Sequence, residues 1–291
     1  MDKLHILSNL WDANLDSVDV ATLSRRLNES HRGSVLKWLV ESLDLLKIDD
    51  RVFFATAILA DQFAVSRPIS SPALEASELQ LVILASLCCS LKTVDCLLDA
   101  SIRDFLDHVS GGHVEPKTIF EKEALILETL NWNVITQSPS VYIESFYYAL
   151  LCDKEVESLV LEQATKSSAL PEWAEKQFFF SQFLLYLSVF QINWFHNQKP
   201  SVLVSACILT SMYVIPDYED RYTLSQIGSL LRNCGWITNN DIYDLIHSTI
   251  ANWEKALSDP SISSILTLFS TPKKMHVSHI RPPRRLLSSG A

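Results

Sequence analysis

Glycine is scarce in this sequence, with 6 glycines among 291 residues. No glycine-rich phosphate loop, G-x-S-x-G nucleophile elbow or H-E-x-x-H motif occurs, so the local signatures of several large enzyme classes are missing. We therefore expect no catalytic residues and no enzymatic activity of the chain's own. Leu, Ala, Ser and Glu are abundant instead, and this composition favours helices over sheets.

The 6 cysteines form no C-x-x-C pair and show no zinc-type spacing with histidine. A metal site or a disulfide framework is one interpretation. Buried thiols in a reducing compartment are the other, and the position of Cys88 and Cys89 inside an apolar helical segment favours it. His276 and His279 lie in an irregular C-terminal stretch without further ligands. We expect neither a metal nor a cofactor.

Basic residues are outnumbered, with 24 Lys and Arg against 34 Asp and Glu and a net charge of −10. A protein that binds nucleic acid through the phosphate backbone normally carries a basic face. The balance therefore predicts no nucleic-acid partner, but a protein partner with a basic surface remains compatible with it.

A secretory signal is also missing, because the N-terminus lacks a basic start followed by a long apolar core. Residues 177–198 are long and apolar enough to be considered as a membrane span. Polar residues interrupt them, and Lys199-Pro200 follows, so a helix buried among other helices fits better. We expect a chain that lies inside the cell and has no membrane partner.

Apolar residues make up 48% of the chain and recur with helical spacing, which predicts an all-α fold with a sizeable core. Five helical segments are expected first, at residues 33–47, 51–65, 78–92, 94–108 and 117–131. The pattern then begins again, at residues 139–151, 171–191, 200–215, 223–232 and 240–257. We predict a five-helix bundle repeated once.

This pattern divides the chain into four parts. Residues 1–30 form an N-terminal helical segment, residues 31–135 the first repeat and residues 136–258 the second. Residues 259–291 lose the regular pattern after Pro260 and contain basic residues and prolines. They are predicted to be a flexible, disordered tail.

Several segments resemble the cyclin box, in the order and spacing of that family. The first is marked by Arg32, Trp38, Glu41 and the triplet Asp61-Gln62-Phe63. The third helix of a cyclin repeat ends near Lys92, and the fifth carries a glutamate at Glu123. The second half resembles the second repeat, with Pro200-Ser201 opening a helix rich in small residues. The exit Trp132-Asn133-Val134 and the overall length resemble D-type cyclins or viral cyclins.

The resemblance implies a regulatory subunit that binds and activates a cyclin-dependent Ser/Thr kinase, controls the cell cycle and occurs in nucleus and cytoplasm. The kinase-binding residues would be Lys92 and Glu123, with an apolar seat made by Cys89, Leu127, Trp132 and Val134. Plainer interpretations exist for each. Lys92 ends a helix, where any cation is favoured, Glu123 could belong to a solvated face, and Leu127 and Val134 could be ordinary core residues.

Cyclins also carry a groove that docks peptides of substrates and inhibitors, and the resemblance places it at Arg32, Val35, Trp38, Glu41 and Gln80. His31 and Ser34 replace apolar residues there, so we expect weakened docking.

Two further expectations come from the departures and from the tail. Thr271-Pro272 resembles a phosphorylation site of proline-directed kinases. Arg284-Arg285-Leu286-Leu287 resembles a docking peptide or, together with Lys273-Lys274, a basic nuclear-import patch. A tail that only adds solubility is the plainer interpretation. The departures from the family pattern leave an alternative function open. In that alternative, a divergent or viral cyclin binds a transcriptional kinase or the transcription machinery as an adaptor.

Overall fold

The computed structural model describes residues 18–68, 70–94, 99–134, 138–151, 171–216, 222–238 and 241–283. Within these ranges every regular element is a helix, and the β-type pairing found there is an isolated bridge between Leu27 and Leu74. The predicted all-α fold is confirmed.

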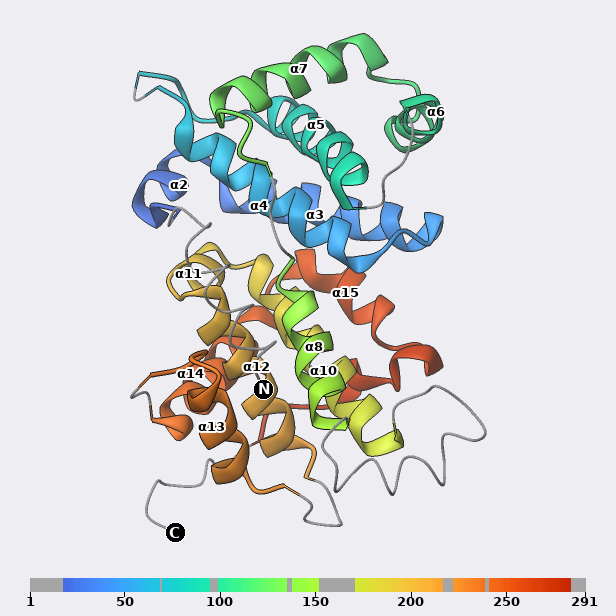
Figure 1. Ribbon diagram of the computed structural model, residues 1–291. Coiled ribbons are helices and arrows are strands. Elements are labelled where there is room, and N and C mark those ends of the chain that lie inside the picture. The colour runs from blue at the N-terminus through green and yellow to red at the C-terminus, as the bar shows by residue number, and fades with distance from the viewer. Residues whose placement is uncertain are drawn as a thin grey trace.

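The first half of the chain is a bundle around α5, which packs against α3, α4 and α7 (Figure 1). Because α5 is surrounded, its residues from Val82 to Leu91 are all buried. The side chain of Asn28 accepts backbone N–H bonds at the start of α3, and Asp49 does so for α4. The helices are α2 (Val20–Arg26), α3 (Glu29–Leu46), α4 (Asp50–Ser66), α5 (Ala76–Val94), α6 (Asp99–Ser110) and α7 (Pro116–Thr129).

The second half is built in the same way around α12, which packs against α10 and α14. Small residues in α12, such as Ser205, Ala206 and Cys207, are fully buried and let its neighbours approach closely. The short helix α11 was not expected from the sequence pattern. The helices are α8 (Ser140–Leu151), α10 (Glu172–Val189), α11 (Ile192–His196), α12 (Pro200–Val214), α13 (Leu224–Asn233) and α14 (Ile242–Ala256).

The C-terminal segment differs from the predicted flexible tail. Residues 260–283, which we call the C-terminal strap, form η1 (Pro260–Ile262), α15 (Ser263–Leu268), η2 (Pro272–Lys274) and η3 (Val277–His279). The prediction of disorder was wrong for these residues, while residues 284–291 lie outside the described part. The physical reason is burial, because four apolar side chains of the strap enter the core: Ile262, Ile265, Phe269 and Val277.

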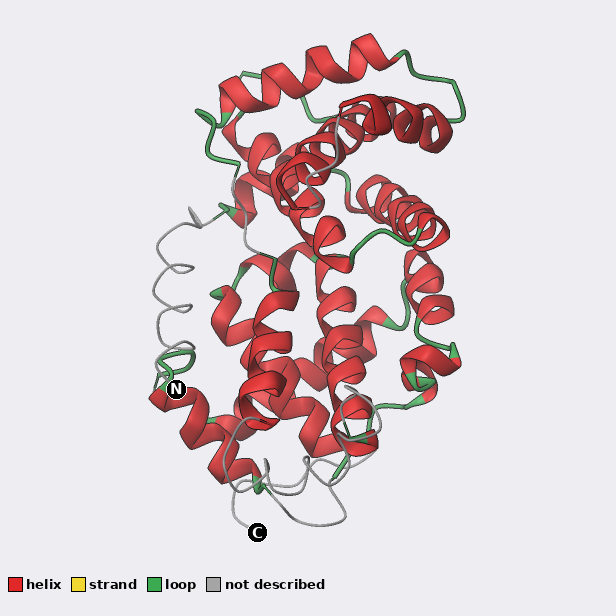
Figure 2. Ribbon diagram, turned by 45° about the vertical axis from the view of Figure 1, so that its right-hand side comes forward, coloured by secondary structure: helices red, strands yellow, loops and turns green. Residues whose placement is uncertain are grey.

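The strap packs against both halves of the molecule. Its η1 and α15 contact α3 of the first half, and its α15 and η3 contact α10 of the second half (Figures 1 and 2). The Phe269 ring lies 5.5 Å from the Phe183 ring and 5.4 Å from the Tyr186 ring, measured between centroids. The strap is therefore an integral part of the fold.

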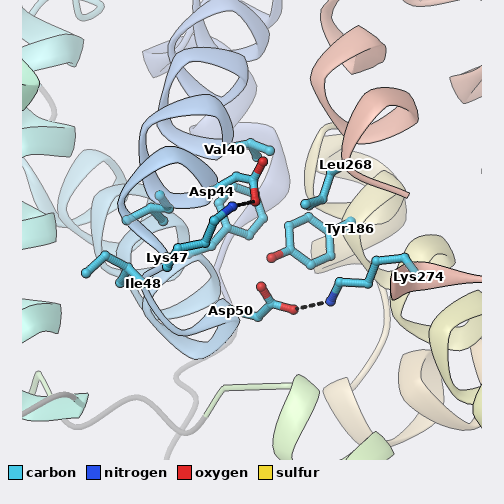
Figure 3. Close-up of a pocket in the computed structure, with 10 residues that line it drawn as sticks. Val40, Asp44, Lys47, Ile48, Asp50, Tyr186, Leu268 and Lys274 are labelled. Atoms are coloured by element: carbon cyan, nitrogen blue, oxygen red, sulfur yellow. Dashed lines mark hydrogen bonds and ion pairs between the residues drawn. The ribbon is translucent and has the colours of Figure 1, made fainter. Parts of the chain in front are cut away.

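A cavity of about 200 Å³ remains where α3, α4, α10 and the strap meet (Figure 3). Apolar side chains such as Val40 and Leu268 line it, and the Tyr186 ring forms part of its wall. At its edge Lys274 Nζ lies 3.1 Å from Asp50 Oδ2, so an ion pair ties the strap to the start of α4.

One described helix, α5, is long and apolar enough to cross a bilayer by length and composition. Of its most apolar stretch, 61% is buried inside the protein. Helices at the centre of a bundle pass the same test, and the packing of α5 against three neighbours accounts for its composition.

Candidate partner-binding site

Lys92 and Glu123 form an ion pair between the end of α5 and the middle of α7. The Lys92 ammonium lies 3.1 Å from the Glu123 carboxylate. The Lys92 side chain is 33% exposed, whereas that of Glu123 is 9% exposed. A partner approaching this surface therefore meets the ammonium, and the carboxylate lies beneath it.

Two thiols hold the Glu123 carboxylate from the interior. Cys88 Sγ lies 3.4 Å from Glu123 Oε2, and Cys89 Sγ lies 3.7 Å from Glu123 Oε1. Burial, followed by the Glu123 charge, raises the pKa of both thiols, to about 12 for Cys89. Both side chains therefore stay protonated and donate to the carboxylate. No motif or spacing in the sequence indicated this role of Cys88.

An aromatic ring sets the direction of the Lys92 side chain. Lys92 Nζ lies 5.4 Å from the centroid of the Phe120 ring, and the Arg103 guanidinium lies 5.9 Å from the same centroid. Phe120 is one turn before Glu123 on α7, so one helix supplies both the carboxylate and the ring that position the ammonium.

The end of α7 brings Leu127 and Trp132 to the same place through a Schellman motif. Trp132 N–H donates to the Leu127 carbonyl at 2.8 Å and Asn131 N–H donates to the Glu128 carbonyl at 3.1 Å. Asn131 has φ of 50° and Trp132 has φ of 61°, both in the left-handed region. Such values are uncommon for residues other than glycine and cost conformational energy.

Trp132 is 69% exposed, which is unusual for so large an apolar side chain. Leu127 and Val134 are half-buried, and Val134 N–H donates to the Trp132 carbonyl at 3.1 Å. Leu127 also follows Glu123 by one helical turn on α7. Of the six residues proposed from the sequence, Cys89, Lys92 and Glu123 contact one another, and Leu127, Trp132 and Val134 form the C-terminal exit of α7.

Of the five residues predicted to form the peptide groove, Arg32 lies in the interior. Its Nε and Nη2 donate to Asp61 Oδ1 and Oδ2 at 3.0 and 2.6 Å, and its Nη1 donates to the Val189 carbonyl at 2.5 Å. The side chains of Arg32 and Asp61 are each 3% exposed. Arg32 therefore offers no contact to a docked peptide.

Asp61 also accepts a hydrogen bond from the second half of the chain. His196 Nε2 on α11 lies 2.8 Å from Asp61 Oδ2. Burial alone would raise the pKa of Asp61, but the Arg32 charge and the His196 hydrogen bond outweigh burial and lower this pKa to about 2. Arg32, Asp61 and His196 form a charged cluster that joins the two halves.

The other groove residues lie at or near the surface of α3 and α5. Val35, Trp38 and Gln80 are half-buried and Glu41 is exposed. Leu45, which the sequence analysis did not single out, follows Glu41 by one turn on α3 and is 72% exposed. Leu45 follows Trp38 by seven residues, and this spacing could have indicated that both side chains lie on the same face of α3. Thr271, the expected phosphorylation site, is exposed on the strap.

Comparisons with known proteins agree on one family. The family described as Cyclin, N-terminal domain matches residues 3–135. Cyclin-B1-1 of Arabidopsis thaliana is 26% identical over 134 residues, which cover 46% of this chain and 30% of that protein. Cyclin-B2-1 of Oryza sativa subsp. japonica is 24% identical over 210 residues, which cover 69% of this chain and 43% of that protein. Residues 3–135 therefore belong to the family of cyclin N-terminal domains.

Two solved structures share the fold of this chain. A viral cyclin from herpesvirus saimiri superposes with a TM-score of 0.62 at 15% identity, over 87% of this chain and 100% of the viral chain. A chain of the CAK complex from Chaetomium thermophilum gives a TM-score of 0.52 at 15% identity, over 98% and 85%.

The chain spans less than half the length of the plant relatives it matches. Those relatives are B-type or mitotic cyclins, and the viral cyclin supports the fold alone. The resemblance of the exit Trp132-Asn133-Val134 to D-type cyclins therefore stays a prediction.

Proposed function

We propose that this chain is a regulatory subunit that binds and activates a cyclin-dependent Ser/Thr kinase, without catalysing a reaction itself. The observation that carries the proposal is the exposed Trp132 at the end of the helix that supports the Lys92–Glu123 pair. The relatives named above are cyclins, which supports a role of this kind.

The physical basis is the preference of the surface for one arrangement of the kinase. A protein kinase is active when a glutamate on a mobile helix pairs with the active-site lysine. A partner that binds this arrangement better than the inactive one shifts the population toward activity. Lys92 suits that task, because its ammonium presents N–H donors to backbone carbonyls and Glu123 fixes its position.

Trp132 would supply much of the apolar contact area. Tryptophan is enriched among residues that dominate binding energy, and such residues lie at the centre of an interface. A tryptophan that is 69% exposed on a left-handed backbone position is costly in an isolated protein. Burial against a kinase would compensate this cost.

The test is binding and activation of purified cyclin-dependent kinases, each assayed on a Ser-Pro peptide with and without this chain. We compare the wild type with Lys92→Ala/Glu123→Ala and with Trp132→Ala. The matched control is Asp44→Ala/Lys47→Ala, which removes an exposed ion pair of similar length (3.0 Å) on α3. Thermal unfolding of every variant shows whether it is folded.

We expect activation by the wild type and the control, and at least a roughly tenfold loss of kinase affinity in the two site variants. Phosphorylation of the peptide by this chain alone would contradict a purely regulatory role. If folded wild type activates no kinase of the cell-cycle or transcriptional classes, the proposed function is wrong. Selective activation of a transcriptional kinase would favour the adaptor alternative over cell-cycle control.

A further inference from the structure

Charge is distributed unevenly along the chain. From Pro260 to the C-terminus there is no Asp or Glu, and the five cations there are Lys273, Lys274, Arg281, Arg284 and Arg285. The 24 basic residues less these five leave 19 against all 34 acidic residues in the first 259 positions, a net charge of −15. A segment of net charge +5 thus follows a strongly acidic body.

The described part of this segment is the C-terminal strap, which has a fixed conformation. Phe269 and Val277 are fully buried, and Ser278 N–H donates to the Phe269 carbonyl at 3.3 Å. Between these anchors the chain forms a closed loop, in which the Lys274 and His276 N–H groups both donate to the Thr271 carbonyl at 3.1 Å. The cations on this loop have defined positions, unlike those of a free tail.

One cation of the strap faces inward, and the others face solvent. Lys274 pairs with Asp50 and lies over the rings of Phe179 and Phe269, at 5.0 and 5.3 Å from their centroids. Four other side chains are exposed and form what we call the basic ridge: Lys273, His276, His279 and Arg281.

The permanent cations of the basic ridge, Lys273 and Arg281, and His279 form no ion pair among the described residues. The rings of His276 and His279 stack with centroids 5.6 Å apart and planes inclined by 19°.

We propose that the basic ridge binds an acidic segment of a protein partner. A ridge of nine residues, from Lys273 to Arg281, matches a short run of Asp or Glu side chains. A nucleic acid fits less well, because a long polyanion would extend over the body with its net charge of −15 and be repelled there. The ridge also presents no exposed Phe, Tyr or Trp on which a base could stack.

The ridge is separate from the candidate kinase-binding surface. In Figure 1 the strap follows α3 and the second half, whereas α7 lies at the opposite end of the first half. The proposal therefore does not depend on kinase binding, and either proposal can fail without the other.

The test uses a fluorescein-labelled peptide of eight glutamates and full-length protein, with fluorescence anisotropy at 50 and 200 mM NaCl. The test variant is Lys273→Gln/Arg281→Gln. Its matched control is Lys117→Gln/Lys255→Gln, which removes two exposed cations on α7 and α14. A DNA duplex carrying the same number of charges is the competing probe.

We expect the peptide to bind at 50 mM NaCl, more weakly at 200 mM, and roughly 5- to 20-fold more weakly to the ridge variant at 50 mM. The control should bind within about twofold of wild type. Three results would overturn the proposal: no peptide binding at 50 mM NaCl, equal losses in both variants, or tighter binding of the duplex than of the peptide. Unchanged thermal unfolding of Lys273→Gln/Arg281→Gln shows that a loss reflects the ridge and not the fold.

Discussion

At the scale of single residues, two tryptophans show that a local motif fixes the backbone but not the burial of its side chains. Trp132 and Trp236 each follow a left-handed residue, Asn131 with φ of 50° and Gly235 with φ of 73°. Their N–H groups donate to the Leu127 and Leu231 carbonyls at 2.8 and 3.0 Å. Trp236 is 1% exposed, whereas Trp132 is 69% exposed.

The difference between the two tryptophans lies in their neighbours. The Trp236 ring packs 5.3 Å from the Tyr142 ring, on a helix of the second half. Among the described residues no ring contact involves Trp132, which follows the C-terminal end of α7. The helix-ending sequence is similar in both places, so the exposure of Trp132 could be learned only from the tertiary structure.

Asp61 gives a prediction about acid stability. Its pKa in the folded state is about 2, below the ordinary value of 3.8. Ionised Asp61 therefore stabilises the fold above about pH 4, and this contribution, on the order of 2 kcal/mol, is lost as the pH falls from about 4 to 2.

Urea unfolding at a series of pH values measures the effect of Asp61. The wild-type free energy of unfolding should fall over this window more steeply than that of Asp61→Asn, which cannot titrate there. Asp61→Asn should be less stable at neutral pH, because it leaves the Arg32 charge buried without its partner. Parallel profiles for the two proteins would show that Asp61 does not carry the acid sensitivity.

At the scale of elements, helix positions followed from the sequence far better than the packing of the C-terminal residues. Periodic apolar residues located α3, α4, α5 and α7, and a proline at the first position of α7 marked its start. The strap escaped prediction because its pieces are short and interrupted by Pro260 and Pro272. Ile262, Ile265 and Phe269 do have helical spacing, but their burial depends on residues far away in sequence.

The packing of the strap on α3 can be tested at Gly33. A Cβ atom added there would lie 2.8 Å from Ser261 Oγ. Gly33→Ala gains about 1 kcal/mol in helix propensity but costs roughly 1–3 kcal/mol from overpacking. Removing the opposing side chain with Ser261→Gly should restore the propensity gain.

A double-mutant cycle on the free energy of unfolding isolates the contact between Gly33 and Ser261. We expect the two substitutions to be coupled by roughly 1–3 kcal/mol, with the double variant more stable than the sum of the single effects. Additive effects would mean that η1 does not rest on α3 in solution.

At the scale of the whole molecule, a charged cluster and the strap both connect the halves, and neither was predicted from the sequence. The cluster of Arg32, Asp61 and His196 joins α3 and α4 to α11, across 135 residues in the case of Asp61 and His196. The resemblance placed Arg32 in a surface groove. A sequence motif does not report how deeply a side chain is buried, so the burial of Arg32 could not be predicted from it. The same resemblance did identify Lys92 and Glu123, which the structure brings to 3.1 Å.

These connections predict cooperative unfolding of the entire chain. Wild-type protein should unfold in urea through one transition seen alike by tryptophan fluorescence and circular dichroism. A chain ending at Asp259 lacks Phe269 and the other buried side chains of the strap, and should show a lower midpoint and transitions that no longer coincide. If the shortened chain unfolds with coincident transitions at the wild-type midpoint, the strap contributes little to the cooperative unfolding of the two halves.

The uneven charge of the chain gives the molecule a permanent electric dipole, with its positive end at the basic ridge. In dilute salt this dipole turns the ridge toward any negatively charged surface before contact, and so raises the rate of productive encounters. At physiological ionic strength the Debye length shrinks to about 8 Å, and the orienting field hardly extends past the first layers of water. Short-range contacts with the strap then determine which partner binds. Ionic strength therefore decides whether the charge of the strap also speeds the encounter or acts only after contact.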